Sequence, residues 1–156
     1  MCPRCIAFAS VASLGLSALL FELSACGGGS STAQPSYTLT AAALTPATVT
    51  AGNMSTSTIT VVPASNYGGS VGLSCSVTGG GTPAPSCSFS TSRVPISSAV
   101  PGTSTLTVST SSTTPGGNYS ISVTGADANN LAPSNGPQVL SLTMSAVILH
   151  VVVIFQ

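Results

Sequence analysis

Few side chains in this 156-residue chain could do chemistry: it has five cysteines, one histidine, two acidic and two basic residues. The histidine, His150, lies in an apolar segment far from the cysteines, whereas a zinc site needs about four ligands. A Ser-His-Asp site would require His150 together with Asp127, and we expect His150 to be a neutral imidazole among apolar neighbours. These residues predict no catalytic site, no metal site and no cofactor, so we expect the protein not to be an enzyme.

The start of the chain has the order of a secretory signal. Arg4 is followed by a mostly apolar run, residues 6–21, and then by small residues up to Cys26. This run is short for a membrane-spanning helix, which needs about 20 apolar residues, and GGGSS follows it instead of a Lys/Arg cluster. We expect residues 1–25 to be removed as a signal peptide and residues 26–36, CGGGSSTAQPS, to form a flexible tether.

The residues Leu23-Ser24-Ala25-Cys26 resemble the lipobox of bacterial lipoproteins. The resemblance implies that the Cys26 thiol carries a lipid, that cleavage occurs just before it, and that the protein is anchored to a membrane in the cell envelope. Gly27 stands where the inner-membrane retention signal of some bacterial lipoproteins has Asp, which favours the outer membrane or cell surface. The alternatives are an ordinary signal peptide ending near a cysteine and an uncleaved N-terminal anchor.

Two cysteines remain once the leader is removed and Cys26 is lipidated: Cys75 and Cys87. Two thiols this close in sequence in an exported protein most simply form a disulfide. Closing a loop of this length stabilises a fold by about 3 kcal/mol in the chain-entropy model. A metal site is the alternative, but it lacks further ligands.

Charge is almost absent after the leader, where only Arg93 and Asp127 remain, and the chain has no lysine. Nucleic-acid binding is therefore not expected, because it requires Lys and Arg to neutralise phosphates. Hydrolysis by a carboxylate pair lacks its second acidic group. Asp127 lies in GADANN, residues 125–130, which we expect to be a polar turn rather than a weak calcium loop.

Short stretches that alternate apolar and hydroxyl residues run through the rest of the chain. This period of two is typical of half-buried antiparallel strands, and Gly, Pro and Asn turn signals separate the stretches. No segment shows sustained helical periodicity. The sequence predicts an all-β fold with strands near residues 37–43, 57–62, 70–77, 104–110, 118–125 and 138–144.

Two stretches echo each other: STSTITVVPASNYGGSVGLSC and GTSTLTVSTSSTTPGGNYSISV. Each reads as strand, Gly/Asn-rich turn and strand, with Tyr67 or Tyr119 near the start of the second strand. Both low-complexity Ser/Thr alternation and a structural half-repeat would produce such an echo.

The succession YTLTAAALTPATVTAGNMSTSTITVVP, SVGLSCSV, PSCSFS, GTSTLTVST and TPGGNYSISVTGAD resembles the immunoglobulin-like modules of bacterial secreted and surface proteins. The resemblance covers most of residues 37–144 and implies an immunoglobulin-like antiparallel β-sandwich of about seven strands. The paired cysteines of those modules match Cys75 and Cys87. The absence of tryptophan excludes the antibody-type core, and these cysteines are too close in sequence for its inter-sheet bridge. We therefore expect the disulfide to join one strand to the loop that follows it.

The last residues, 145–156, form an apolar tail, SAVILHVVVIFQ. Its β-branched residues favour an extended strand, which could associate through its edge. A membrane span and the end of a truncated gene are the alternatives.

These features together predict a non-catalytic lipoprotein that displays an immunoglobulin-like structural or adhesive module in the cell envelope. The alternative is a carbohydrate- or protein-binding accessory module, orphaned from a larger exported enzyme. The expected partners are a membrane, through the lipid on Cys26, and a protein or polysaccharide. The strand contexts of Tyr37, Tyr67 and Tyr119 suit core edges or a tyrosine corner better than a sugar-stacking face.

Overall fold

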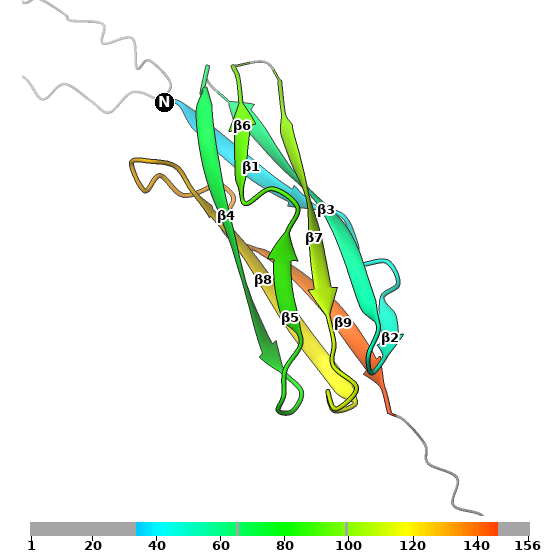
Figure 1. Cartoon of the computed structure of the whole chain (residues 1–156). Coiled ribbons are helices and arrows are strands. Elements are labelled where there is room, and N and C mark those ends of the chain that lie inside the picture. Colours follow the sequence, from blue (N-terminus) through cyan, green and yellow to red (C-terminus); the bar gives the residue numbers. More distant parts are fainter. Residues whose placement is uncertain (1–33, 65, 99, 147–156) are drawn as a thin grey trace, which may run out of the picture. The chain divides into compact units, whose positions relative to one another are not determined.

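Nine strands form the part of the chain that the structure describes, residues 34–64, 66–98 and 100–146 of a computed structural model (Figure 1). These residues contain no helix, and hence none long and apolar enough to cross a membrane. The predicted signal peptide, Cys26 and tail residues 147–156 lie outside the described residues. The strands are β1 (Ser36–Ala41), β2 (Thr48–Thr50), β3 (Met54–Ala64), β4 (Gly69–Gly79), β5 (Ser86–Phe89), β6 (Arg93–Ile96), β7 (Gly102–Ser109), β8 (Gly117–Ala126) and β9 (Gln138–Ser145).

The strands form two sheets. One is four-stranded with the order β1-β3-β7-β5, and the other is five-stranded with the order β2-β9-β8-β4-β6. Neighbouring strands are antiparallel except β2 and β9, which run parallel. Buried side chains from both sheets belong to one hydrophobic cluster. The prediction of an all-β fold is confirmed.

Alternation along each long strand supplies this core. In β8, Tyr119, Ile121 and Val123 are buried, whereas Ser120 and Ser122 between them are partly exposed. Successive side chains of a strand point to opposite faces, so the apolar set enters the core and the hydroxyl set faces outward. The hydrophobic period therefore fixes which face of each strand is buried.

The number of strands differs from the prediction of about seven. The six alternating stretches correspond to β1, β3, β4, β7, β8 and β9. The additional strands β2, β5 and β6 have only three or four residues, too few to show a clear alternation. All three lie at sheet edges, where Pro95 of β6 is tolerated because no further strand needs its missing N–H.

The outer edge of β1 is covered by the loop between β8 and β9. The side-chain amide of Asn135 donates to the carbonyl oxygen of Leu39 at 2.7 Å, and the N–H of Leu39 donates to Asn135 Oδ1 at 3.0 Å. The N–H of Ser134 donates to the carbonyl oxygen of Tyr37 at 2.8 Å. Asn135 thus takes the place of a neighbouring strand at an edge that could otherwise pair with another chain.

The two echoing stretches of the sequence lie side by side in both sheets. β3 pairs with β7, and β4 pairs with β8. Thr58 lies directly opposite Thr105, its counterpart in the echo. Ser74 lies opposite Thr124, and their hydroxyl oxygens are 2.7 Å apart. The two halves of the echo are therefore structural neighbours.

The start of β1 and the end of β9 lie at opposite ends of the two sheets (Figure 1). β1 begins at the end that carries the β3–β4 and β8–β9 loops. β9 finishes at the other end. At that end the β2–β3 and β7–β8 loops meet, and the N–H of Gly52 donates to the carbonyl oxygen of Ser111.

Candidate functional site

Cys26, the predicted lipidation site, lies outside the described residues, and so does His150. Cys75 and Cys87 form a disulfide, with their Cα atoms 6.3 Å apart. Both residues are partly buried and pack against the hydrophobic core.

This disulfide joins the two sheets, so the expectation that it links a strand to its following loop is wrong. Cys75 lies on β4 of the five-stranded sheet, and Cys87 lies on β5 of the four-stranded sheet. Packed sheets are about 10 Å apart, and an extended chain covers about 3.3 Å per residue. The short segment between the cysteines is therefore long enough to cross from one sheet to the other.

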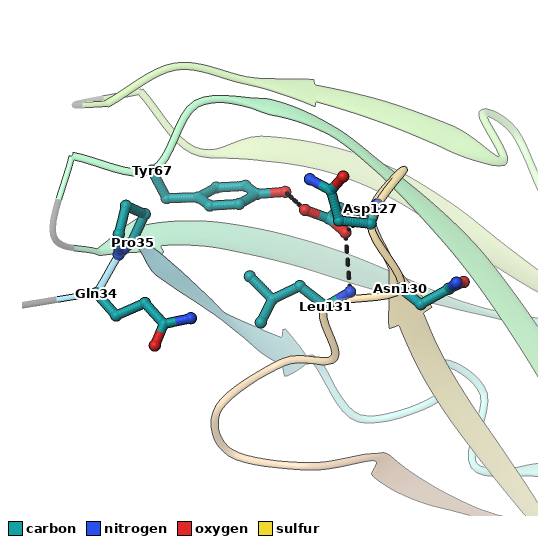
Figure 2. A pocket seen from close by; sticks show the side chains of 7 residues that line it. Gln34, Pro35, Tyr67, Asp127, Asn130 and Leu131 are labelled. Carbon is teal, nitrogen blue, oxygen red and sulfur yellow. Dashed lines mark hydrogen bonds between the residues drawn. The ribbon is translucent and has the colours of Figure 1, made fainter.

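A pocket of about 480 Å³ lies at the end of the domain where β1 begins (Figure 2). Tyr67, from the β3–β4 loop, and Asp127, from the β8–β9 loop, line it together with Gln34 and Pro35, which directly precede β1. The Tyr67 hydroxyl donates a hydrogen bond to Asp127 Oδ2 at 3.0 Å. The pocket therefore contains the single acidic side chain that follows Glu22 in the sequence.

Asp127 holds its own loop together. Its Oδ1 accepts the backbone N–H of Asn129 at 2.7 Å and that of Leu131 at 2.8 Å. The GADANN segment is thus a turn closed by its own carboxylate, and both carboxylate oxygens are occupied by hydrogen bonds within the domain. No group of three or more His, Cys, Asp or Glu residues that could hold a metal occurs in residues 34–64, 66–98 and 100–146.

The electrostatics of the pair oppose proton transfer near neutral pH. The backbone hydrogen bond from Leu131 is the largest cause that lowers the pKa of Asp127 from its ordinary 3.8. Burial, and next the hydrogen bond to Asp127, raises the pKa of Tyr67 to about 12. The carboxylate therefore stays ionised and the phenol stays protonated, which suits a structural contact rather than acid-base catalysis.

All three tyrosine rings are buried. Tyr37 and Tyr67 lie with ring centroids 5.2 Å apart, and the Tyr37 hydroxyl donates to the carbonyl oxygen of Leu131 at 2.8 Å. Tyr119 donates to the carbonyl oxygen of Pro115 at 2.9 Å, near the start of β8. These rings belong to the core and offer no sugar-stacking face, as the strand contexts predicted.

A second hollow, of about 400 Å³, lies on the outer face of β4, β8 and β9. Its lining consists of Ser and Thr hydroxyls, one amide, Gly79 and part of the buried residue Tyr119, and none of these residues is charged. Sequence reasoning missed this site because alternation shows which residues point outward but not which strands become neighbours. The residues with outward side chains at this hollow are Thr78, Asn118, Ser120, Ser141 and Thr143.

No protein-family model matches this chain, and no curated protein matches it.

Proposed function

We propose that this protein is a non-catalytic, lipid-anchored protein of the cell envelope that displays an immunoglobulin-like β-sandwich as a structural or adhesive module. The observation that carries the proposal is the position of β1. Ser36 begins β1 at one end of the domain and follows the LSAC sequence through the tether residues 27–35. A lipid on Cys26 would hold that end toward a membrane and leave the opposite end free for contact.

The strand order supports the immunoglobulin-like part of the proposal. In the constant-type immunoglobulin fold, strands A, B, E and D form one sheet and C, F and G form the other. The orders β1-β3-β7-β5 and β9-β8-β4 correspond to these sheets, and the disulfide crosses between them. The Tyr119 hydroxyl bonds back to Pro115, as in a tyrosine corner.

One departure from that fold concerns the segment between β4 and β7. The chain first crosses to β5 beside β7, then returns to β6 beside β4, and then crosses again to β7. This order gives a variant of the immunoglobulin arrangement in which the inter-sheet disulfide sits at the first crossing.

The non-catalytic part of the proposal is supported by the state of Asp127. Its oxygens accept hydrogen bonds from Tyr67, Asn129 and Leu131, and its pKa is lowered. A general base needs a free lone pair and a pKa near the working pH. The lowered pKa of Asp127 makes it a weak base at neutral pH, and its hydrogen bonds tie it to its own loop.

Metabolic labelling with a fatty-acid analogue tests the anchor. We expect the full chain to incorporate label, the Cys26→Ala variant to incorporate none, and the leader variant Cys5→Ala to label like the wild type. Equal labelling of wild type and Cys26→Ala would overturn the lipid anchor.

The alternative function, a carbohydrate- or protein-binding accessory module, is favoured by one observation. The hollow on the outer face of β4, β8 and β9 gathers uncharged polar side chains from three strands. A pull-down with the full chain on polysaccharide tests this alternative.

A further inference from the structure

We propose that the outer face of β4, β8 and β9 binds a neutral polysaccharide, with the 400 Å³ hollow as the centre of the site. The inference rests on the proposed adhesive function and names the kind of partner that the module contacts. We call this surface the hydroxyl face and define it by Thr78, Asn118, Ser120, Ser141 and Thr143.

The register of the three strands builds the hydroxyl face. Thr78 of β4 lies opposite Ser120 of β8, and Ser120 lies opposite Ser141 of β9, which makes one row across the sheet. Asn118 and Thr143 form the adjacent row. Neighbouring strands are about 4.8 Å apart, and alternate residues along a strand are about 6.8 Å apart. Polar groups therefore recur at a regular spacing across this face of the sheet.

The chemistry of these side chains fits a neutral polyhydroxyl ligand. The Thr143 hydroxyl donates to Asn118 Oδ1 at 3.1 Å, so it can still accept a hydrogen bond from a ligand, and the Asn118 amide can donate through its NH₂ group. A sugar hydroxyl has the same dual capacity. The hydroxyl face has no charged residue, and the whole chain has no lysine, so it provides no cationic partner for phosphate, sulfate or carboxylate groups.

Two neighbouring residues shape the surface. Gly79 has φ +87°, and a Cβ there would lie 2.8 Å from the carbonyl oxygen of Asn118, so the position stays without a side chain beside the hollow. Val139 precedes Ser141 by two residues on the same outer face of β9 and is 66% exposed. Its methyl groups provide an apolar contact for the C–H groups of a sugar ring.

A protein partner fits this surface less well. The energetic centres of protein–protein interfaces are enriched in Trp, Tyr and Arg, while Ser is depleted. All three tyrosines of this chain are buried in the core, and the hydroxyl face has no arginine. The side chains of the hydroxyl face are small and polar, so we expect one copy of the site to bind its ligand weakly.

Anchoring compensates for weak individual sites. Many copies held on one membrane bind a repeating polymer at several points, and each further contact becomes intramolecular. A single domain can therefore bind weakly while a densely covered surface adheres firmly.

A pull-down of the detergent-solubilised full chain on microcrystalline cellulose and on chitin tests the proposal, with heparin-agarose as the charged comparison. We expect binding to at least one neutral polymer, no binding to heparin, and no elution at about 1 M NaCl, because screening acts on charges. The double variant Thr78→Val and Thr143→Val keeps the side-chain shape and removes two hydroxyls. The polymer should retain about tenfold less of this variant than of the wild type.

The matched control places the same substitutions on the other sheet. Thr58→Val and Thr105→Val lie opposite each other on exposed positions of β3 and β7, and this variant should bind like the wild type. Absence of binding to both neutral polymers, elution by salt, or equal loss in both variants would each overturn the hydroxyl face. Fatty-acid labelling is independent of these results, so failure of the binding site is distinguishable from failure of the anchor.

Discussion

The side chain of Asn135 closes the edge of β1, and its removal tests how much this closure stabilises the fold. Asn135→Ala removes the hydrogen bond to the Leu39 carbonyl oxygen and the one from the Leu39 N–H. Leu39 is fully buried, so its two backbone groups lose their partners in a place where water enters only if the loop shifts.

The magnitude follows from these two groups. An unsatisfied buried donor or acceptor costs about 1–3 kcal/mol. Asn135 itself is exposed, so water can partly replace its amide, and the lower end of the range applies to each group. We therefore expect Asn135→Ala to lower the free energy of unfolding by about 2 kcal/mol, which corresponds to about 8 °C in Tm for a domain of this size.

Urea unfolding of the full chain, followed by tyrosine fluorescence, measures the change, since the chain has three tyrosines, all buried, and no tryptophan. Ser134→Ala is the matched control, because the Tyr37 carbonyl keeps the bond from the Ser134 N–H after the hydroxyl is lost. It should change stability by less than about 0.5 kcal/mol. A loss below about 0.5 kcal/mol for Asn135→Ala would refute the role of this side chain as an edge cover.

An isosteric variant separates the two hydrogen bonds. In Asn135→Asp the carboxylate still accepts the Leu39 N–H but faces the Leu39 carbonyl oxygen without a proton to donate. The nearby carbonyl raises the pKa of the new carboxyl in the folded state, so this variant should gain stability relative to wild type as the pH falls. A constant difference across pH would show that the bond to the Leu39 carbonyl contributes nothing.

Three other perturbations have expected outcomes in the same unfolding assay. Replacing both Cys75 and Cys87 by alanine should cost about 3 kcal/mol, because the disulfide closes a short loop between the sheets; a cost below about 1 kcal/mol would contradict this. Gly80→Ala should cost about 3 kcal/mol, because φ is +59° and the new Cβ would overlap a buried phenol ring, whereas Gly136→Ala, at φ +72° in open space, should cost only about 1 kcal/mol. Equal costs for the two glycine variants would exclude the ring contact as the cause. The folded pKa of Asp127 lies below its ordinary 3.8, so its contribution is present above about pH 4 and is lost as the pH falls further. Asp127→Asn should remove this acid-dependent loss, and an unchanged acid profile would assign the loss to other groups.

The sequence was sufficient for the long strands because their apolar residues recur with a period of two over many positions. Short edge strands such as β2 do not contain enough residues for such a pattern. The sequence therefore predicted about seven strands, whereas the structure has nine in the described residues. The path between β4 and β7 could not be predicted either. Local patterns specify strands and turns, whereas the choice of sheet depends on which partner edge is open once the core has formed.

The candidate sites show a similar division. The pairing of Cys75 with Cys87 was predicted from the expected compartment and the cysteine count, but its position between the sheets depended on where β5 lies. The turn around Asp127 could be read locally because Asp and Asn stabilise such turns through their own backbone. The hydroxyl face required the registers of three strands, which no single stretch of sequence contains.

The parallel pairing of β2 with β9 has a mechanical consequence. Thr48 lies opposite Thr143 and Thr50 opposite Ser145, and the N–H of Thr143 donates to the carbonyl oxygen of Ala47 at 3.0 Å. A pulling force between the start of β1 and the end of β9 draws these two strands past each other along their length. The hydrogen bonds between them are then loaded together in shear, instead of opening one after another. A module built this way resists stretching between these two points more than one whose bonds open in turn.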